Sequence, residues 1–239
     1  MRDGKIWESF SEAVSDIPDG ATLMMVHFAG PGGLCQNLIL ALRDHGAKNL
    51  TVISCANFGF GGGTRIKPDF KEYIDPHILV ENGQVKKGIC TWQKGDGIGR
   101  NAFETATISG KVEAEIVPLG VLSHRIRAGG TGVPAFYSPV GVGTLYARNK
   151  ETRVFNGREY ILEYPLRADF GFVRAYKADK MGNLVYKGTG KTVNPLIAKA
   201  CDKVLVEVDE IVEIGELGPE EIVTPGIYVD RIIQVPQKG

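Results

Sequence analysis

Apolar residues in the first half of the chain recur at helical spacing in some stretches and form short runs in others. The first helix is predicted from five apolar positions at helical spacing: Ile6, Phe10, Ala13, Val14 and Ile17. The sequence Pro-Asp-Gly at 18–20 predicts its end. A second periodic stretch over 34–42 predicts another helix, which ends where Gly46 supplies a left-handed residue.

Four short, largely apolar runs separate or follow such helices, and each predicts a buried strand. Further helices are predicted near 101–109 and 120–128. Buried strands that alternate with helices indicate a parallel sheet covered on both faces. The four strands are predicted at 23–26, 50–54, 88–92 and 114–117.

The second half of the chain carries a hairpin signal between two further buried strands. Asn156-Gly157 separates 153–155 from 159–162, and both turn residues suit positive φ. Strands are predicted at 170–175 and 203–208, with a helix between them that Asn194 caps. We therefore expect an α/β fold, an open, mostly parallel, doubly wound sheet with helices on both faces and a small β-hairpin excursion, in a single domain over 1–239.

Composition narrows the classes of function. Lys plus Arg and Asp plus Glu number 28 each, so no net charge attracts nucleic acid or an anionic membrane. No apolar run approaches the length of a membrane span, which predicts a cytoplasmic chain without a membrane partner. The cysteines are far apart and outside any zinc-type spacing, so we expect reduced thiols and no metal site. They are Cys35, Cys55, Cys90 and Cys201.

Glycine is the unusual component, with 31 residues against only 8% aromatic residues. Such a composition predicts tight turns, or loops where the backbone approaches a ligand. The Gly-rich turn at 29–33 follows a predicted strand directly, and His27 lies beside it. The other histidines are scattered, and we interpret them as solvated or hydrogen-bonded structural residues: His45, His77 and His124. The chain has no Gly-x-Ser-x-Gly, which disfavours an α/β-hydrolase mechanism.

Eight segments of the chain carry a family resemblance, at 19–25, 29–33, 36–39, 127–139, 141–144, 177–186, 194–196 and 224–229. Together they resemble the α-type subunit of family I coenzyme A transferases, the 3-oxoacid group. The similarity covers nearly the whole chain in the expected order.

The resemblance implies a subunit that moves coenzyme A between an acyl-CoA and a carboxylic acid. In that family a glutamate carboxylate attacks the thioester, and covalent intermediates conserve its energy. The glutamate belongs to a Ser-Glu-Asn-Gly motif of a β-type subunit, and this chain has no such motif. The resemblance therefore implies no catalytic residue here, a β-type partner in a heterodimer or heterotetramer, and no cofactor besides the CoA thioester substrate.

Glu81-Asn82-Gly83 is similar to part of the nucleophile motif. However, it precedes residues 84–88, which resemble the α-type segment that leads from a helix into a strand. An Asn-Gly pair is ordinary in an exposed turn. We therefore interpret Glu81 as a surface turn residue.

The segment 26–34 departs most from the family pattern. The family has Gly-Gly-Phe, then a later glycine and proline, whereas this chain has Val26-His27-Phe28, Gly32 and Leu34. In the family this turn lies by the active site, where small residues let backbone N–H groups approach the acyl oxygen. We expect an altered acyl pocket, in which the substrate-binding residues are His27, Phe28, Gly30, Gly32 and Gly33.

A second glycine block contains Gly129, Gly130 and Gly132 within residues 128–134. Either the backbone there adopts positive φ or another surface comes very close. We favour a structural turn over direct contact with the partner or CoA. The three glycines are the remaining candidates for substrate or CoA binding.

Two other functions stay open on this sequence. One is a hydrolase or ring-cleaving lyase on the same scaffold, without the covalent glutamyl intermediate. The other is a ligand-binding or regulatory homologue without chemistry. A partner with Ser-Glu-Asn-Gly favours transfer, its absence favours hydrolysis or cleavage, and failure to associate favours the non-catalytic protein.

Overall fold

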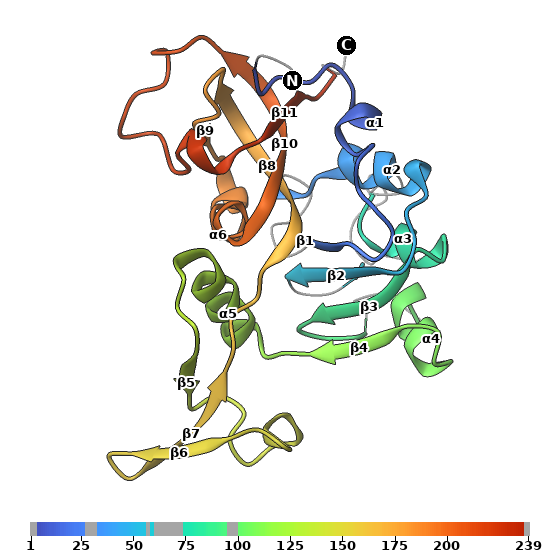
Figure 1. Ribbon diagram of the computed structural model, residues 1–239, viewed down its shortest axis with the longest axis vertical. Helices are drawn as coiled ribbons and strands as arrows, with labels where there is room; N and C mark the ends of the chain where they lie inside the picture. Colours follow the sequence, from blue (N-terminus) through green and yellow to red (C-terminus); the bar gives the residue numbers. More distant parts are fainter. Residues whose placement is uncertain (1–3, 27–32, 56–57, 60–73, 95–99, 237–239) are drawn as a thin grey trace.

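A largely parallel sheet lies at the centre of the computed structural model, which describes residues 4–26, 33–55, 58–59, 74–94 and 100–236 (Figure 1). Its strand order is β11-β10-β8-β1-β2-β3-β4, and β9 pairs with β8. Neighbouring strands are parallel except β9 with β8. The strands are β1 (Thr22–Val26), β2 (Leu50–Cys55), β3 (Val85–Cys90), β4 (Glu113–Ile116), β8 (Ala168–Asp179), β9 (Leu184–Val185), β10 (Cys201–Val212) and β11 (Arg231–Gln234).

The predicted strands are confirmed, but several differ in their bounds. The strands predicted at 170–175 and 203–208 each begin two residues earlier and end four residues later, as β8 and β10. β3 begins at Val85, before the apolar run that starts at residue 88. The intervening Lys87 forms ion pairs with Glu113 (2.9 Å) and Glu115 (3.2 Å) on the neighbouring edge strand β4. Cross-strand charge pairs of this kind let a polar stretch belong to a sheet.

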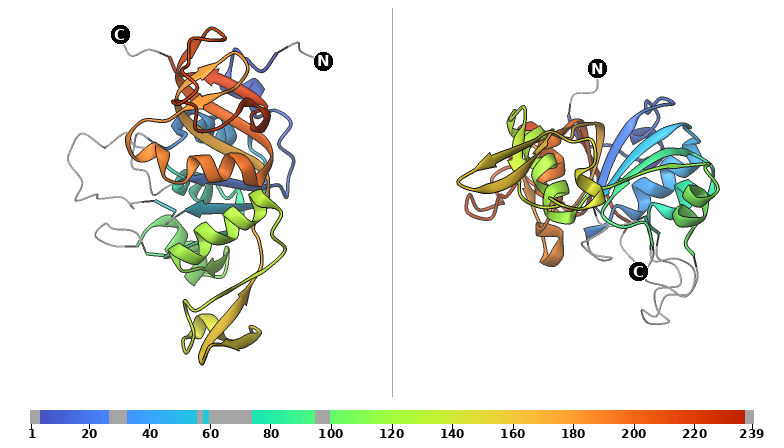
Figure 2. Two further views of the ribbon diagram at one scale, coloured as in Figure 1. Left: turned by 90° about the vertical axis from the view of Figure 1, so that its left-hand side faces the viewer. Right: turned by 90° about the horizontal axis from the view of Figure 1, so that it is seen from below.

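Helices cover both faces of the sheet, as the doubly wound prediction requires (Figure 2). Each face has its own apolar core: Leu23 and Met25 of β1 face one core, whereas Met24 and Val26 face the other. One face carries α1 (Phe10–Ala13), α2 (Gln36–His45), α3 (His77–Glu81) and α4 (Ala102–Ile108), and the other carries α5 (Leu119–Thr131) and α6 (Asn194–Ala200).

The first predicted helix is much shorter than its apolar pattern indicated. Ile6 instead forms a parallel bridge with Ile232, so the chain is extended there. Ser9 caps α1 by accepting from the N–H of Glu12 (3.2 Å), and the helix therefore begins only at Phe10. Ala13, Val14 and Ile17 are buried, but the prediction of one continuous helix was wrong.

Two further helices correct the sequence interpretation. α5 continues past the predicted end at 128 and contains Gly129 and Gly130; its left-handed cap is Gly132, with φ 74°. The cap of α6 is Val193, and Asn194 is already helical. The predicted cap at Asn194 is therefore wrong, because its side chain is bonded elsewhere.

The predicted hairpin is confirmed and belongs to a small antiparallel sheet that projects from the body (Figure 1). Its turn residues Asn156 and Gly157 have φ of 50° and 75°. At its base the buried Glu163 accepts from Lys150 (2.8 Å), and Arg125 donates to the carbonyl of Tyr164 (2.8 Å). The strands are β5 (Phe136–Ser138), β6 (Thr152–Phe155) and β7 (Arg158–Glu163), in the order β5-β7-β6.

Candidate active site

The direction of the strand order reverses between β1 and β8. From β1 the chain proceeds through β2, β3 and β4 on one side, whereas β8, β10 and β11 extend the sheet on the other side. In open parallel sheets, ligands bind outside the carboxyl ends of the strands at such a switch point. The candidate site therefore lies where β1 ends, at Val26.

Only part of the predicted substrate-binding turn lies within the described residues. His27, Phe28, Gly30 and Gly32 lie outside them, and Gly33 lies inside. Gly33 is buried, and its carbonyl accepts a hydrogen bond from the side chain of Asn194 (3.1 Å). The glycine that enters α2 is thus held against the start of α6.

Asn194 joins three segments at this edge. Its Nδ2 donates to the carbonyls of Gly33 and Gly190 (3.2 Å), and its Oδ1 accepts from the N–H of Arg174 on β8 (2.9 Å). The side chain is fully buried. Because buried polar groups are costly without partners, these three bonds fix the relative position of the segments.

Glu207 on β10 is a buried carboxylate, 2% exposed, at the first turn of α2. Its Oε2 accepts from the backbone N–H groups of Asn37 (3.0 Å) and Leu38 (3.2 Å). Its Oε1 accepts from the side-chain amide of Asn37 (2.8 Å). The first N–H groups of a helix lack intrahelical partners and favour negative charge, so the carboxylate anchors the helix start.

Arg174 supplies the positive charge beside Glu207. The two residues are register partners on β8 and β10, with Arg174 Nε 3.9 Å from Glu207 Oε1. Arg174 also donates to the carbonyls of Ala175 (2.9 Å) and Glu207 (3.1 Å), and it pairs with Asp209. Burial raises the pKa of Glu207, although Arg174 and the donated hydrogen bonds oppose the rise.

A cavity of about 300 Å³ opens beside Arg174. Its walls are formed by 174–176, 187–190 and Asp209. Lys187 lies over the ring of Tyr176, with its Nζ 4.9 Å from the ring centroid. The edge thus combines a cationic cavity with the buried anchors of α2.

Asp75 and His77 form a hydrogen-bonded pair at the start of α3, with His77 Nδ1 2.5 Å from Asp75 Oδ1. Gly59 packs so closely here that a Cβ would lie 2.6 Å from that oxygen. Burial lowers the pKa of His77, but the hydrogen bond and the charges of Asp75 and Glu81 raise it by more, so the pKa lies above its usual range. This pairing agrees with our interpretation of His77 as a hydrogen-bonded structural histidine.

The second glycine block serves close packing on α5. A Cβ on Gly129 would lie 2.0 Å from the carbonyl oxygen of Leu166, and one on Gly130 would lie 2.8 Å from the Cβ of Lys199. Gly132 has open space around it and ends the helix at positive φ. The close approach of another surface therefore explains Gly129 and Gly130, whereas positive φ explains Gly132. A contact with CoA at any of the three stays a prediction.

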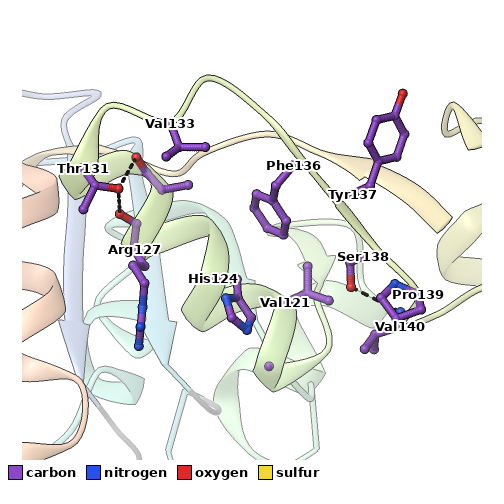
Figure 3. Close-up of a pocket in the computed structure, with 12 residues that line it drawn as sticks. Val121, His124, Arg127, Thr131, Val133, Phe136, Tyr137, Ser138, Pro139 and Val140 are labelled. Carbon is purple, nitrogen blue, oxygen red and sulfur yellow. Dashed lines mark hydrogen bonds between the residues drawn. The ribbon is translucent and has the colours of Figure 1, made fainter. Parts of the chain in front are cut away.

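A cavity of about 490 Å³ lies between α5 and residues 133–140 (Figure 3). His124 and Arg127 line it from the helix, and Phe136 faces His124 with ring centroids 6.0 Å apart. None of Gly129, Gly130 and Gly132 lines it. The predicted glycine block thus lies beside this cavity and not in its wall.

Glu81 lies at the end of α3, where 61% of its side chain is exposed. Asn82 caps the helix, and Gly83 follows with φ 67°. This local geometry is the surface turn that we predicted.

Sequence reasoning missed Arg174 and Glu207, and it assigned Asn194 the wrong role. One signal for Glu207 was present, because it is a charged residue within the apolar run at 204–208. A buried carboxylate requires partners, and such a position therefore merits a search for donors. The donors on α2 are distant in sequence, so the pattern alone could not name them.

Comparison with known proteins identifies the family to which the chain belongs. The family model described as coenzyme A transferase matches residues 7–235. The chain belongs to the coenzyme A transferase family. This membership confirms the resemblance predicted from the sequence motifs.

The curated relatives are A-type subunits and longer enzymes. The A-type subunit of a probable succinyl-CoA:3-ketoacid coenzyme A transferase from Bacillus subtilis is 43% identical, over 96% of this chain and 90% of its own length. The A-type subunit of a 3-oxoadipate CoA-transferase from Pseudomonas putida is 41% identical, over 97% and 94%. A mitochondrial succinyl-CoA:3-ketoacid coenzyme A transferase from Mus musculus is 40% identical over 95% of this chain but only 44% of its own length. The chain is thus a CoA-transferase subunit of the α type.

Solved structures share the fold at lower identity. The acyl-CoA transferase of Escherichia coli O157:H7, in a thioester complex with CoA, has a TM-score of 0.80 at 24% identity. The match covers 99% of this chain and 48% of that one. Glutaconate coenzyme A-transferase from Acidaminococcus fermentans has a TM-score of 0.77 at 16% identity, over 97% of this chain and 76% of that chain.

Proposed function

We propose that this chain forms part of the active site of an enzyme that moves coenzyme A between an acyl-CoA and a 3-oxo or related carboxylic acid. A β-type partner subunit supplies the nucleophilic glutamate. The two subunits form a heterodimer or a heterotetramer.

One observation carries this proposal. Bacterial relatives that are named as A-type subunits match the chain nearly end to end, whereas the mouse enzyme contains a further part longer than the match. The sequence has no Ser-Glu-Asn-Gly. A separate β-type chain that carries this motif would correspond to the part that the mouse enzyme holds in one polypeptide.

The proposed reaction proceeds through two half-reactions. The partner's glutamate carboxylate attacks the thioester carbonyl, and CoA thiolate leaves as an acyl anhydride forms. The thiolate then attacks the glutamyl carbonyl of the anhydride, which releases the free acid and leaves a glutamyl-CoA thioester. The acceptor acid reverses both steps. The thioester energy is retained throughout, so the reaction requires no cofactor besides the CoA substrate.

This chain contributes the acyl side of the site in the proposal. Its substrate-binding residues are His27, Phe28, Gly30, Gly32 and Gly33. Gly33 lies at the carboxyl edge of β1, at the switch point of the sheet, which supports this assignment. An imidazole at 27 would add a hydrogen-bond donor to the acyl pocket, so polar or larger acyl groups are favoured over acetyl.

We place the assembled enzyme in the cytoplasm. Its four cysteines are free and buried, which suits a reducing compartment. Across the described residues, no helix combines the length and apolarity that crossing a membrane requires.

The test combines the purified chain with its β-type partner. We expect the chain alone to transfer no CoA, and the mixture to transfer CoA with ping-pong kinetics. Glu81→Gln should leave the activity of the mixture unchanged. Transfer by the chain alone that is abolished by Glu81→Gln would overturn the proposal.

A further inference from the structure

Glu207 is a deeply buried carboxylate at the candidate site, and the reaction chemistry above gives it no task. It is saturated by three N–H donors from α2 and flanked by Arg174. A carboxylate so enclosed has no open approach to a thioester, so it is unsuited to nucleophilic attack. Buried ion pairs are also weak sources of stability, because desolvation offsets their attraction. Its enclosed position and its contacts with α2 therefore point to a positioning role.

The contacts define what Glu207 positions. It holds the N–H groups of Asn37 and Leu38, while Asn194 holds the carbonyl of Gly33. These anchors bracket residues 33–38, through which the chain passes from the substrate-binding segment into α2. Both anchors come from the side of the sheet that begins with β8, across the switch point.

We propose that Glu207 is a positioning residue that sets the acyl specificity of the enzyme by anchoring the start of α2. It acts through Asn37 and Leu38, and it fixes the described end of the 26–34 segment relative to β8 and β10. This inference rests on the proposed role of that segment in acyl binding.

The charge of Glu207 depends on its surroundings. Arg174 faces it from β8, Cys35 lies near it on the α2 side, and Asp209 on the same strand binds Arg174. Burial raises the pKa of Glu207, so acidification protonates it earlier than an exposed carboxylate. A protonated carboxyl group accepts the α2 N–H bonds more weakly.

The experiment uses the complex of this chain with its β-type partner. Glu207→Gln keeps the shape but removes the charge, and Asn37→Ala removes only the side-chain contact. Glu210→Gln is the matched control, because Glu210 pairs with Lys177 (2.9 Å) across the same two strands but is only half-buried. Each variant is assayed with a panel of acyl-CoAs at a temperature where melting curves show it to be folded.

We expect Glu207→Gln to change the ratio of kcat/KM between two acyl-CoAs by on the order of tenfold. Asn37→Ala should shift it less in the same direction, and Glu210→Gln should leave it unchanged. As pH falls, the wild-type ratio should move toward that of Glu207→Gln, whose own ratio should stay constant. Amide exchange of Asn37 and Leu38 should rise in Glu207→Gln only.

A folded Glu207→Gln complex with an unchanged ratio would overturn the proposal and leave Glu207 a structural role. Unchanged exchange at Asn37 and Leu38 would overturn it as well. If the wild-type complex transfers no CoA, the proposed function fails. If amide exchange at Asn37 and Leu38 still rises in Glu207→Gln, Glu207 does anchor the start of α2. Only the link between this anchor and acyl transfer is then refuted.

Discussion

Two glycine-containing regions of this protein are held in place by different forces. Gly129 and Gly130 let α5 pack directly against the backbone of Leu166 and against Lys199. The carbonyl of Gly33 instead accepts a hydrogen bond from Asn194 at the edge of the sheet, where Asn194 and Glu207 are polar and buried. The first region depends on the space that glycine leaves, and the second depends on the side chains around the glycine.

The largest effect is expected on the packed region. Gly129→Ala would place a Cβ 2.0 Å from the carbonyl oxygen of Leu166, so α5 and the chain entering β8 must separate. We expect a loss of more than about 3 kcal/mol in the free energy of unfolding, measured by urea denaturation.

The control lies on the same helix. A Cβ on Gly120 meets no heavy atom within 4 Å. Gly120→Ala should therefore be neutral or stabilise the chain by about 0.5 kcal/mol. Equal stabilities of the two variants would contradict the packing role of Gly129.

The polar region should respond to its side chains. Asn194→Ala leaves the carbonyls of Gly33 and Gly190 and the N–H of Arg174 without this partner. We expect a loss of about 2–3 kcal/mol in the free energy of unfolding. Thr192→Ala removes an exposed bond to Thr189 in the same loop and should cost less than about 1 kcal/mol. A similar loss in both variants would refute the special role of Asn194.

The two regions should also differ in their effect on acyl specificity. In the assembled enzyme, His27→Gly should change the ranking of kcat/KM across an acyl-CoA panel, with a loss of about 1–3 kcal/mol for the preferred substrate. His124→Ala, in the cavity beside the packed glycines, is the control and should keep the ranking. An unchanged ranking after His27→Gly would assign specificity to the partner subunit.

The smallest effect concerns pH and the Asp75–His77 pair. The pKa of His77 is raised in the folded chain by this hydrogen bond and by nearby carboxylates, which outweigh burial. Its stabilisation is therefore complete below the usual pKa of 6.5 and is lost as pH rises through the folded value. The stability difference between wild type and His77→Gln should shrink from pH 6 to pH 9 in urea titrations. Asp75→Asn should reduce this pH dependence, with Glu81 alone left to raise the pKa of His77. A stability difference that grows as pH rises would contradict the stabilising role of the Asp75–His77 pair.

Sequence patterns predicted the sheet well because its central strands are buried on both faces and its helices carry an apolar stripe. The patterns failed where long-range pairing or tertiary packing overrides the local signal. The apolar spacing of residues 6–17 indicated one helix, but Ile6 pairs with Ile232 at the far end of the chain. Gly129 and Gly130 indicated a turn, yet tertiary packing keeps them helical.

The candidate site was predicted only in part. Gly33 could be placed from the order of strand, turn and helix. Asn194 was mistaken for a helix cap because the local sequence Asn-Pro favours one, whereas its partners come from Gly33, Gly190 and Arg174. The hydrogen bonds between Glu207 and α2 depend on crossovers that bring β10 near the helix. The local spacing of apolar residues does not predict such long-range contacts.

The position of β1 in the sheet also has a kinetic consequence. β1 is a central strand, but one of its neighbours, β8, is synthesised only after β4, α5 and the antiparallel excursion. During synthesis, β1 through β4 can pair while the other edge of β1 stays uncovered. Closure by β8 is a long-range event that slows folding. The same reversal that places the candidate site therefore leaves the nascent chain exposed to aggregation until residues beyond 172 have emerged.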